Sequence, residues 1–528
     1  MPSRRHLLAA IAATTTLSAP AIPVHGATAR SLRFVPQADL AVLDPLFTTA
    51  YVVRNHALMV YDTLYGLDAS LKPSPQMVEQ HLVENEGRRW TFRLREGLLF
   101  HDGEPVRARD CVASIRRWSQ RDPLGQLLAA RTDDIAATDD RSFVIRLSRP
   151  FAPMLDALGK LASPICAIMP ERLALTEPSR VVAEVVGSGP FRFRGDQWVV
   201  GSRAVYERFA GYLPREGGTP EWTAGPKVVH FDRVEWHTIP DPSTAAAALL
   251  RGEVDWVERP DFDLLPVLRR SRDLMIETTP QLGSVSICRL NHLHPPFDNP
   301  AIRRAVLSAV NQADFMNAVA GTEPGAWQDG VGIWPPGTTL ASDAGMEAIR
   351  APRDIAGARE AIRQAGYRGE RVVSLVSTDF PAGRAAGEVG AELFRRLGLN
   401  LDHVATDWAA VVQRRASREP VERGGWSCFY TGFATLDLLH PGIHQLVRGS
   451  GERAWFGWPS IPRMEALADA WLDAGDLAAQ RVIAAEMQRL AFAEVPYLPL
   501  GQYFLPTAYR RSLTGVLRGP PLFWNVRR

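Results

Sequence analysis

The chain has 528 residues, of which 46% are hydrophobic and 22% are charged. These proportions exclude a disordered or fibrous protein, and the length exceeds what one hydrophobic core serves, so we expect two or three domains. The 60 basic and 58 acidic residues nearly balance, which argues against nucleic acid as a partner.

Residues 1–29 have the pattern of an export signal. Arg4 and Arg5 precede a short apolar run at Leu7–Ala13, and small residues follow as far as Ala27-Thr28-Ala29. The paired arginines favour the twin-arginine route, with Sec export as the alternative. No later stretch approaches the roughly 18 uninterrupted apolar residues of a membrane span, and no cysteine lies near the expected cleavage site. We therefore predict a soluble protein exported to the periplasm.

Strand and helix patterns follow in alternation. Ser31–Val35 is predicted to be the first strand, and a helix is expected at about Val52–Tyr61. Further along, Phe92 and Leu94 alternate with arginines, the period of a half-buried strand. Leu98-Leu99-Phe100 is expected to return beside that strand as the second arm of a hairpin.

An amphipathic helix is predicted next, because apolar residues recur at helical spacing from about Ala108 to Trp118 opposite a row of arginines. His101 and Asp102 lie just before it. Such a pair could carry acid–base chemistry, but adjacent strand residues point to opposite faces, so we interpret the pair as part of a turn. The stretch therefore predicts structure and no catalytic constellation.

Residues 100–105, Phe-His-Asp-Gly-Glu-Pro, together with this helix resemble the signature of the extracellular solute-binding proteins of family 5. These are the periplasmic receptors of ABC importers for oligopeptides, dipeptides and nickel. Four further blocks of the chain resemble the family in the same order: 186–191, 251–256, 295–305 and 494–500. In the second of these, the resemblance implies that Gly252 takes the left-handed conformation at the end of a helix.

The resemblance implies an α/β fold of two lobes, the type II (cluster C-like) periplasmic-binding-protein fold, with an extra subdomain inserted in the first lobe. Lobe I would comprise residues 30–68, 187–278 and 492–528, the inserted subdomain 69–186, and lobe II 279–491. Ligand would be trapped between the lobes by hinge closure.

Helices and one strand are predicted for lobe II from the residues themselves. Asn299 and Pro300 have the residue types of an N-cap and a first helical position. The other expected elements are helices at Asp354–Ala365, Ala385–Leu397, Pro462–Ala474 and Leu477–Ala491, and a strand at Val372–Ser377.

The resemblance also implies a ligand site. Peptide-binding members place a carboxylate near the end of lobe II to hold the ammonium group of the peptide, but here Thr435 or Leu436 stands in that place. Asp437 could serve if the loop is one residue longer; if Asp437 does not reach the cleft, we expect dipeptides with free N-termini to bind poorly. Arg384 corresponds to an arginine that holds a ligand carboxylate, with a solvated residue at the helix start as the alternative.

Aromatic residues surround the Asp437 segment and fit an apolar ligand cleft. For Trp426, Tyr430 and Phe433, packing in the core of a strand is the alternative. The candidate ligand-binding residues among them are Trp426, Tyr430, Phe433 and Trp455.

His440 and His444 have the spacing of metal ligands on a helix, but Pro441-Gly442 between them indicates a turn, so we predict no metal and no cofactor. The four cysteines lack C-x-x-C spacing and are expected to be buried thiols, although one disulfide is open: Cys111, Cys166, Cys288 and Cys428.

The expected function is that of a monomeric receptor that captures a peptide or peptide-like solute and delivers it to an ABC permease and its ATPase. A non-peptide solute (an opine, a metal chelate or a sugar) is the alternative ligand. A secreted hydrolase is disfavoured, because the chain has no G-x-S-x-G, H-E-x-x-H or S-x-x-K motif. A periplasmic chaperone or sensor with the same fold is a third class.

Overall fold

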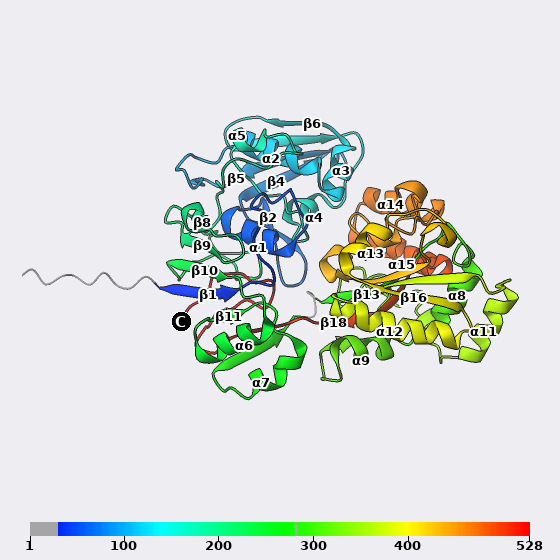
Figure 1. Cartoon of the computed structure of the whole chain (residues 1–528). Coiled ribbons are helices and arrows are strands. Elements are labelled where there is room, and N and C mark those ends of the chain that lie inside the picture. The colour runs from blue at the N-terminus through cyan, green and yellow to red at the C-terminus, as the bar shows by residue number, and fades with distance from the viewer. Residues whose placement is uncertain (1–29, 280–282) are drawn as a thin grey trace, which may run out of the picture.

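The computed structural model describes residues 30–279 and 283–528, and these fold into two lobes (Figure 1). The predicted export signal at 1–29 lies outside the described residues. No helix among residues 30–279 and 283–528 is long and apolar enough to cross a membrane.

Lobe I is built on a mixed sheet whose strands lie in the order β12-β19-β11-β1-β10-β9-β8. The predicted first strand is confirmed as β1, which lies near the middle and runs parallel to β10 and β11. Its strands are β1 (Ser31–Val35), β8 (Phe191–Phe193), β9 (Arg203–Arg208), β10 (Arg233–His237), β11 (Trp256–Val257), β12 (Leu274–Thr278) and β19 (Pro506–Arg510).

Three helices cover this sheet. The helix α1 (Tyr51–Val60) shares one hydrophobic cluster with β1 and β10, while α6 (Pro242–Arg251) and α7 (Leu265–Arg269) share another with β11 and β12. Gly252 ends α6 in the left-handed conformation, with φ of 74°, as the resemblance implied.

The inserted subdomain has its own antiparallel sheet in the order β4-β5-β7-β6. The predicted hairpin was wrong in its second arm: β5 pairs with β4 and β7, whereas Leu99 makes a single bridge to Pro105. The elements of this part are β3 (Pro73–Pro75), β4 (Val78–Glu84), β5 (Arg89–Leu94), β6 (Thr132–Ala137), β7 (Ser142–Leu147), α2 (Ala108–Ser119), α3 (Pro123–Ala129), α4 (Met154–Gly159) and α5 (Glu171–Ala174). The strand β2 (Tyr65–Leu67), just before the expected start at residue 69, pairs with β3 in a separate two-stranded sheet.

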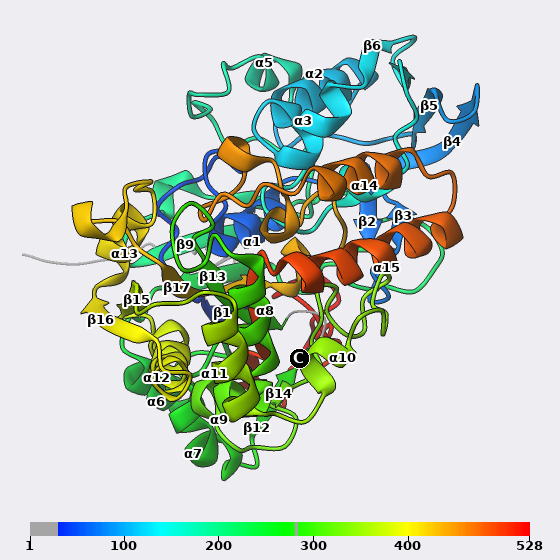
Figure 2. The same cartoon turned by 90° about the vertical axis from the view of Figure 1, so that its right-hand side faces the viewer.

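Lobe II contains a six-stranded sheet in the order β14-β18-β13-β17-β15-β16. Its strands are β13 (Ser284–Leu290), β14 (Trp327–Gln328), β15 (Arg371–Ser377), β16 (Asn400–Thr406), β17 (Cys428–Ala434) and β18 (Tyr497–Tyr503). Its helices are α8 (Pro300–Ser308), α9 (Gln312–Ala320), α10 (Glu347–Arg350), α11 (Ile355–Gln364), α12 (Pro381–Arg396), α13 (Trp408–Arg414), α14 (Pro462–Asp473) and α15 (Leu477–Glu494). Asn299 caps α8 through its side chain, as predicted, and α8 lies beside α11 (Figure 2).

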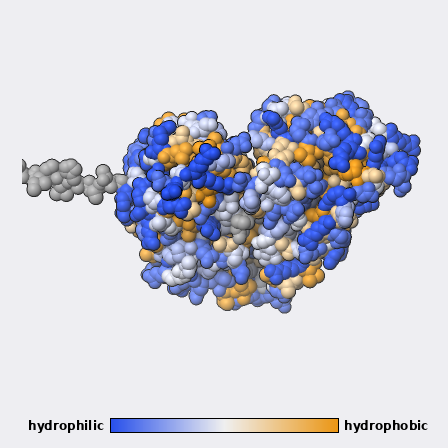
Figure 3. Space-filling model, turned by 90° about the horizontal axis from the view of Figure 1, so that it is seen from below, coloured by the Kyte–Doolittle hydropathy of each residue, from blue (hydrophilic) through white to orange (hydrophobic). Residues whose placement is uncertain are grey.

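The chain crosses between the lobes twice, from β12 to β13 and from β18 to β19. The second crossing corrects the boundary expected at residue 492. Tyr497–Tyr503 is buried throughout and pairs with both β13 and β14, so it belongs to the lobe II sheet. The chain therefore returns to lobe I only after Tyr503. In the view of Figure 3 both lobes are mostly hydrophilic, with an indentation where they meet.

Candidate functional site

A pocket of about 290 Å³ lies between the lobes and is lined by both of them. We name it the Asp437 pocket. Lobe I and the inserted subdomain contribute Thr49, Tyr51, Pro123, Lys160, Ala162 and Ser163, and lobe II contributes Gly432, Phe433, Ala434, Asp437, Ile443 and Gln445.

Asp437 reaches the cleft. It lies in a short 3₁₀ turn (Thr435–Asp437) directly after β17, and its Oδ2 accepts a hydrogen bond of 2.7 Å from the hydroxyl of Tyr51. Its Oδ1 accepts no hydrogen bond from the part of the chain that the structure describes. One carboxylate oxygen therefore remains for a ligand.

Electrostatics favour a protonated tyrosine beside this carboxyl group. Burial, and after it the charge of Asp437, raises the pKa of Tyr51 well above its ordinary value. Burial also raises the pKa of Asp437, and the hydrogen bond from Tyr51 partly offsets that effect. A ligand cation that replaced water around Asp437 would lower its pKa again, so the site is suited to an ammonium group.

A buried ion pair forms the opposite wall. Lys160 and Asp122 pair with each other, and Asp122 also caps α3 by accepting hydrogen bonds from the backbone N–H groups of Leu124 and Gly125. Lys160 is thus already neutralised by a carboxylate that is held by a helix N-terminus. The net charge that remains for a ligand in this pocket comes from Asp437.

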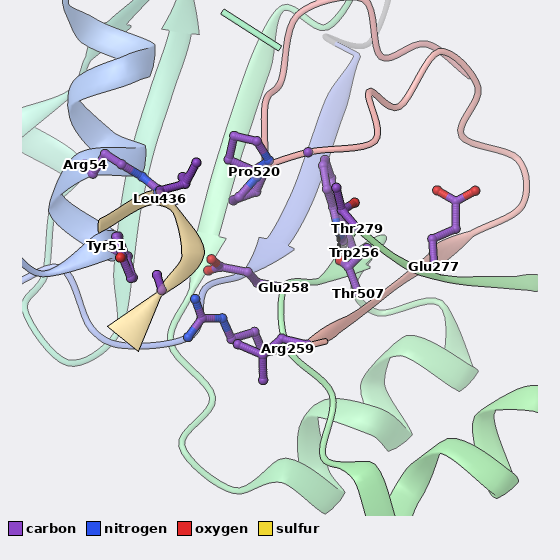
Figure 4. Close-up of a pocket in the computed structure, with 14 residues that line it drawn as sticks. Tyr51, Arg54, Trp256, Glu258, Arg259, Glu277, Thr279, Leu436, Thr507 and Pro520 are labelled. Carbon is purple, nitrogen blue, oxygen red and sulfur yellow. Dashed lines mark hydrogen bonds between the residues drawn. The ribbon is translucent and has the colours of Figure 1, made fainter. Parts of the chain in front are cut away.

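Three further pockets adjoin the Asp437 pocket, and each shares lining residues with it. One of about 430 Å³ contains Trp455 and shares Ile443 and Gln445, and one of about 250 Å³ shares Lys160 and Ile443. The latter is largely apolar: Leu67, Leu71, Leu161, Leu340, Leu436, Leu439 and Trp471 line it. A third, of about 70 Å³, lies on the hinge side of Tyr51 (Figure 4). A central polar site with apolar side pockets suits a short ligand with side chains.

The family signature supports the helix that carries Tyr51. His101 is buried, its Nε2 donates to the carbonyl of Gly189 (3.0 Å), and its Nδ1 accepts from the N–H of Gly187 (3.4 Å). Burial lowers the pKa of His101 to about 4, so the ring is neutral. A Cβ at Gly187 would lie 2.1 Å from the carbonyl oxygen of Val60, so only glycine lets this loop pack directly on the end of α1.

A buried arginine binds the backbone of residues Trp455–Trp458, which we name the Trp455 segment. Arg289 donates to four backbone carbonyl groups, those of Leu446, Trp455, Phe456 and Pro496. The rings of Phe433 and Trp455 meet edge to face, with centroids 5.2 Å apart. Together they form an aromatic wall of the cleft.

The structure separates the predicted site residues into two groups. Phe433 and Asp437 line the Asp437 pocket, and Trp455 lines its neighbour. Trp426, Tyr430 and Thr435 are buried inside lobe II; the hydroxyl of Thr435 donates to the carbonyl of Gly283. Arg384 is exposed on α12 and lines none of the four cleft pockets. In this conformation the cleft is not faced by Trp426, Tyr430, Thr435 or Arg384.

The histidines and cysteines are accounted for by packing. His440 stacks on Trp471 at 5.1 Å, and the Nε2 of His444 donates to the carbonyl of Ile333. Across residues 30–279 and 283–528 there is no group of three side chains that could hold a metal ion. The expectation of buried thiols is confirmed for the four cysteines, which are free.

Sequence reasoning missed Tyr51, Arg54, Glu258 and Arg259, all of which line the pocket on the hinge side of Tyr51 (Figure 4). Two signals were present. Arg54-Asn55-His56 is a polar run inside a helix whose other residues are aliphatic or aromatic. Glu258-Arg259 directly follows β11, which is parallel to β1. Ligand sites of α/β proteins gather at the carboxyl ends of such strands.

Comparisons with known proteins agree with the resemblance in the sequence. The family described as bacterial extracellular solute-binding proteins, family 5 Middle, matches residues 72–436. The chain is 37% identical to a probable peptide ABC transporter periplasmic-binding protein, y4tO, of Sinorhizobium fredii, over 100% of this chain and 99% of the relative. It is 25% identical to the glutathione-binding protein GsiB of Escherichia coli, over 90% of each.

Solved structures show the fold. The periplasmic binding protein AgaA of A. tumefaciens, in complex with agropinic acid, superposes with a TM-score of 0.75 at 20% identity, over 94% of this chain and 98% of that one. The expected two-lobed, type II periplasmic-binding-protein fold is thereby confirmed. The chain belongs to the bacterial extracellular solute-binding proteins of family 5.

Proposed function

We propose that this protein is the periplasmic receptor of an ABC importer and that it captures a short peptide, or a peptide-like solute, with a free amino group. It acts without catalysis, as a monomer, and delivers the solute to a membrane permease driven by an ATPase. Closure of the two lobes traps the ligand, and the closed form is the one that the permease receives.

The observation that carries this proposal is the carboxylate of Asp437, which lies between the lobes with one oxygen bonded to Tyr51 and the other open to the pocket. Removing an ammonium group from water costs several kcal/mol unless an anion compensates. Asp437 supplies that anion, and the apolar pocket beside Lys160 accepts an apolar side chain of the ligand. The expectation of poor dipeptide binding depended on Asp437 lying outside the cleft. Because Asp437 lines the cleft, we now expect dipeptides with free N-termini to bind well.

The names of similar proteins support a peptide-like ligand. The relative from Sinorhizobium fredii is named as a probable peptide transporter component, and GsiB is named for glutathione, a tripeptide-like molecule. An opine is the alternative ligand, favoured by the complex of AgaA with agropinic acid.

The test is calorimetric titration of the mature protein, after unfolding and refolding to remove any bound solute. The probes are alanyl-phenylalanine, alanyl-leucyl-alanine and their N-acetylated forms. We expect the free peptides to bind at least about tenfold more tightly, because only they present an ammonium group to Asp437. Equal affinity, or a preference for the acetylated peptides, would contradict the proposal. Mass spectrometry of the solute that co-purifies with the protein separates a peptide from an opine.

A further inference from the structure

Arg54 is a buried cation without a carboxylate partner. Its side chain is 6% exposed, and its Nε and Nη2 both donate to the Oδ1 of Asn55, at 3.2 and 2.8 Å. Among residues 30–279 and 283–528 it forms no ion pair, and its Nη1 makes no hydrogen bond. Buried guanidinium groups are normally paired, since an uncompensated charge in the interior is costly. Arg54 lines the pocket beside Tyr51.

A second guanidinium lines the same pocket. Arg259 makes neither an ion pair nor a hydrogen bond with the described part of the chain, and its Cζ lies 6.0 Å from the centroid of the Tyr51 ring. The Cζ of Arg54 lies 4.4 Å from the same centroid. Figure 4 shows these side chains, with Arg54 and Tyr51 projecting from α1 and Arg259 following β11. Two guanidinium groups therefore lie close to the ring of Tyr51, and burial, followed by the charge of Arg259, lowers the pKa of Arg54.

The nearby carboxylates are already engaged. Glu258 accepts hydrogen bonds from the N–H of Gln37 (2.8 Å) and from the side-chain amide of Asn55 (3.0 Å). Glu277 accepts from the hydroxyl of Tyr509 (2.9 Å) and pairs with Arg518 (3.5 Å). Asp437 accepts a hydrogen bond from the hydroxyl of Tyr51. These charges moderate the field at Arg54, but none of them forms an ion pair with either arginine.

We propose that Arg54 and Arg259 form an anion subsite that binds a carboxylate of the ligand, on the hinge side of Tyr51. The subsite rests on the proposed function and deepens it: the ligand carries its ammonium group at Asp437 and a carboxylate at the two arginines. The pocket of about 70 Å³ has room for a carboxylate and its waters.

The separation of the two anchors limits the length of the ligand. Both anchors contact one tyrosine side chain, so they lie within roughly 10 Å of each other. An extended peptide spans about 3.5 Å a residue. The proposed ligand is therefore a dipeptide or tripeptide with a free C-terminus, or an acidic molecule of that length.

The test compares alanyl-phenylalanine with its C-terminal amide by calorimetry, in the wild type and in Arg54→Gln and Arg259→Gln. We expect the wild type to prefer the free acid by roughly tenfold or more, and each variant to lose most of that preference while its affinity for the amide stays unchanged. Arg270→Gln, an exposed arginine of lobe I outside the cleft pockets, is the matched control and keeps the preference. If the peptides bind but the preference for the acid survives in both variants, the subsite is refuted and the proposed function stands.

A second measurement needs no ligand. If Arg54 is held for a ligand anion, its charge is uncompensated in the empty protein, so Arg54→Gln keeps or raises the Tm of the empty protein. A fall of the Tm by more than about 5 °C would assign Arg54 a structural role and overturn the proposal. If no peptide binds the wild type in either form, the proposed function fails, and the Tm of Arg54→Gln still decides whether that arginine is structural.

Discussion

The hydroxyl of Tyr51 in lobe I and the carboxylate of Asp437 in lobe II are joined by a hydrogen bond of 2.7 Å across the cleft. The bond links the lobes at the site where the ligand ammonium is proposed to bind. Because the carboxylate has a second oxygen, a ligand can add to this contact instead of replacing it. The hydrogen bond between Tyr51 and Asp437 therefore stabilises the closed form. A ligand that binds the closed form more tightly than the open form stabilises it further.

Asp437→Asn is expected to weaken the binding of free dipeptides by about 10- to 100-fold, because a hydrogen bond to a charged group is replaced by one to a neutral amide. The affinity for N-acetylated peptides stays unchanged. Calorimetry measures both, with Asp314→Asn, at an exposed residue of α9, as the control. Undiminished binding of free dipeptides in Asp437→Asn would mean that another acid holds the amine.

The same substitution is expected to stabilise the empty protein at neutral pH. Burial raises the pKa of Asp437 above its ordinary value of 3.8, so the folded state holds the proton more tightly than the unfolded state does. Its ionised form therefore costs stability above the folded-state pKa, and this cost disappears as the pH falls to the unfolded-state value. Thermal unfolding should show a higher Tm for Asp437→Asn at pH 7 and a smaller difference at pH 4. A lower Tm for the variant at pH 7 would contradict this reasoning.

Acid is expected to unfold the protein through its buried neutral histidines. The pKa of His101 is lowered from 6.5 to about 4, so the unfolded state takes up a proton between these values and the folded state does not. The contribution of His101 to the free energy of unfolding is fully present above pH 6.5. At pH 4 that free energy is lower by about 3 kcal/mol from His101 alone. Urea unfolding at several pH values measures the slope, which should be shallower in His101→Gln, where an amide can still donate to Gly189. An identical slope in wild type and variant would exclude this role.

Asp473 of lobe II pairs with both Arg131 and Arg149 of the inserted subdomain. Asp473→Asn is expected to favour the open form, and so to enlarge the radius of gyration of the empty protein and to weaken peptide binding about threefold. Small-angle scattering and calorimetry measure these effects, and saturating peptide should contract both proteins. Glu486→Gln, which removes an ion pair with Arg463 inside lobe II, is the control. A radius that peptide leaves unchanged would argue against hinge closure.

Export is expected to need the paired arginines. Replacing Arg4 and Arg5 together by lysine keeps the positive charge but removes the twin-arginine pattern, so we expect the mature protein to disappear from the periplasmic fraction. Immunoblots of cell fractions measure this. Normal processing and export of the double variant would assign the protein to the Sec route.

Much of the fold could be predicted, because its signals are local. The strand at Ser31–Val35 and the cap at Asn299 follow from residue type and spacing over a few positions, and the left-handed Gly252 follows from a short motif that resembles the family. Strand partners are not local. The second arm of the hairpin was placed at Leu98–Phe100, whereas β5 pairs with strands on either side that lie up to 57 residues away, as with Arg89 and Arg146.

The site was harder to predict than the fold. The residues at 435–437 could be aligned with the family in more than one register, and only the 3₁₀ turn after β17 decides that Asp437 points into the cleft and Thr435 into lobe II. Tyr430 lies on β17 and Trp426 lies just before it, and both are buried inside lobe II. Aromatic residues in a buried strand and in a ligand cleft look alike in a sequence, because both need apolar area.

Arg289 holds the Trp455 segment by hydrogen bonds to the carbonyl oxygens of Trp455 and Phe456, and its Cζ also lies 5.2 Å from the centroid of the Trp455 ring. Gly457 lets that segment lie on the backbone of β13. The hydrogen bonds to these two carbonyl groups do not depend on which side chain stands at position 455. Exchange of Trp455 for a smaller or polar residue should widen or re-polarise that side pocket while the wall stays in place. The receptor can therefore acquire a new preference for ligand side chains at this position without rebuilding its scaffold.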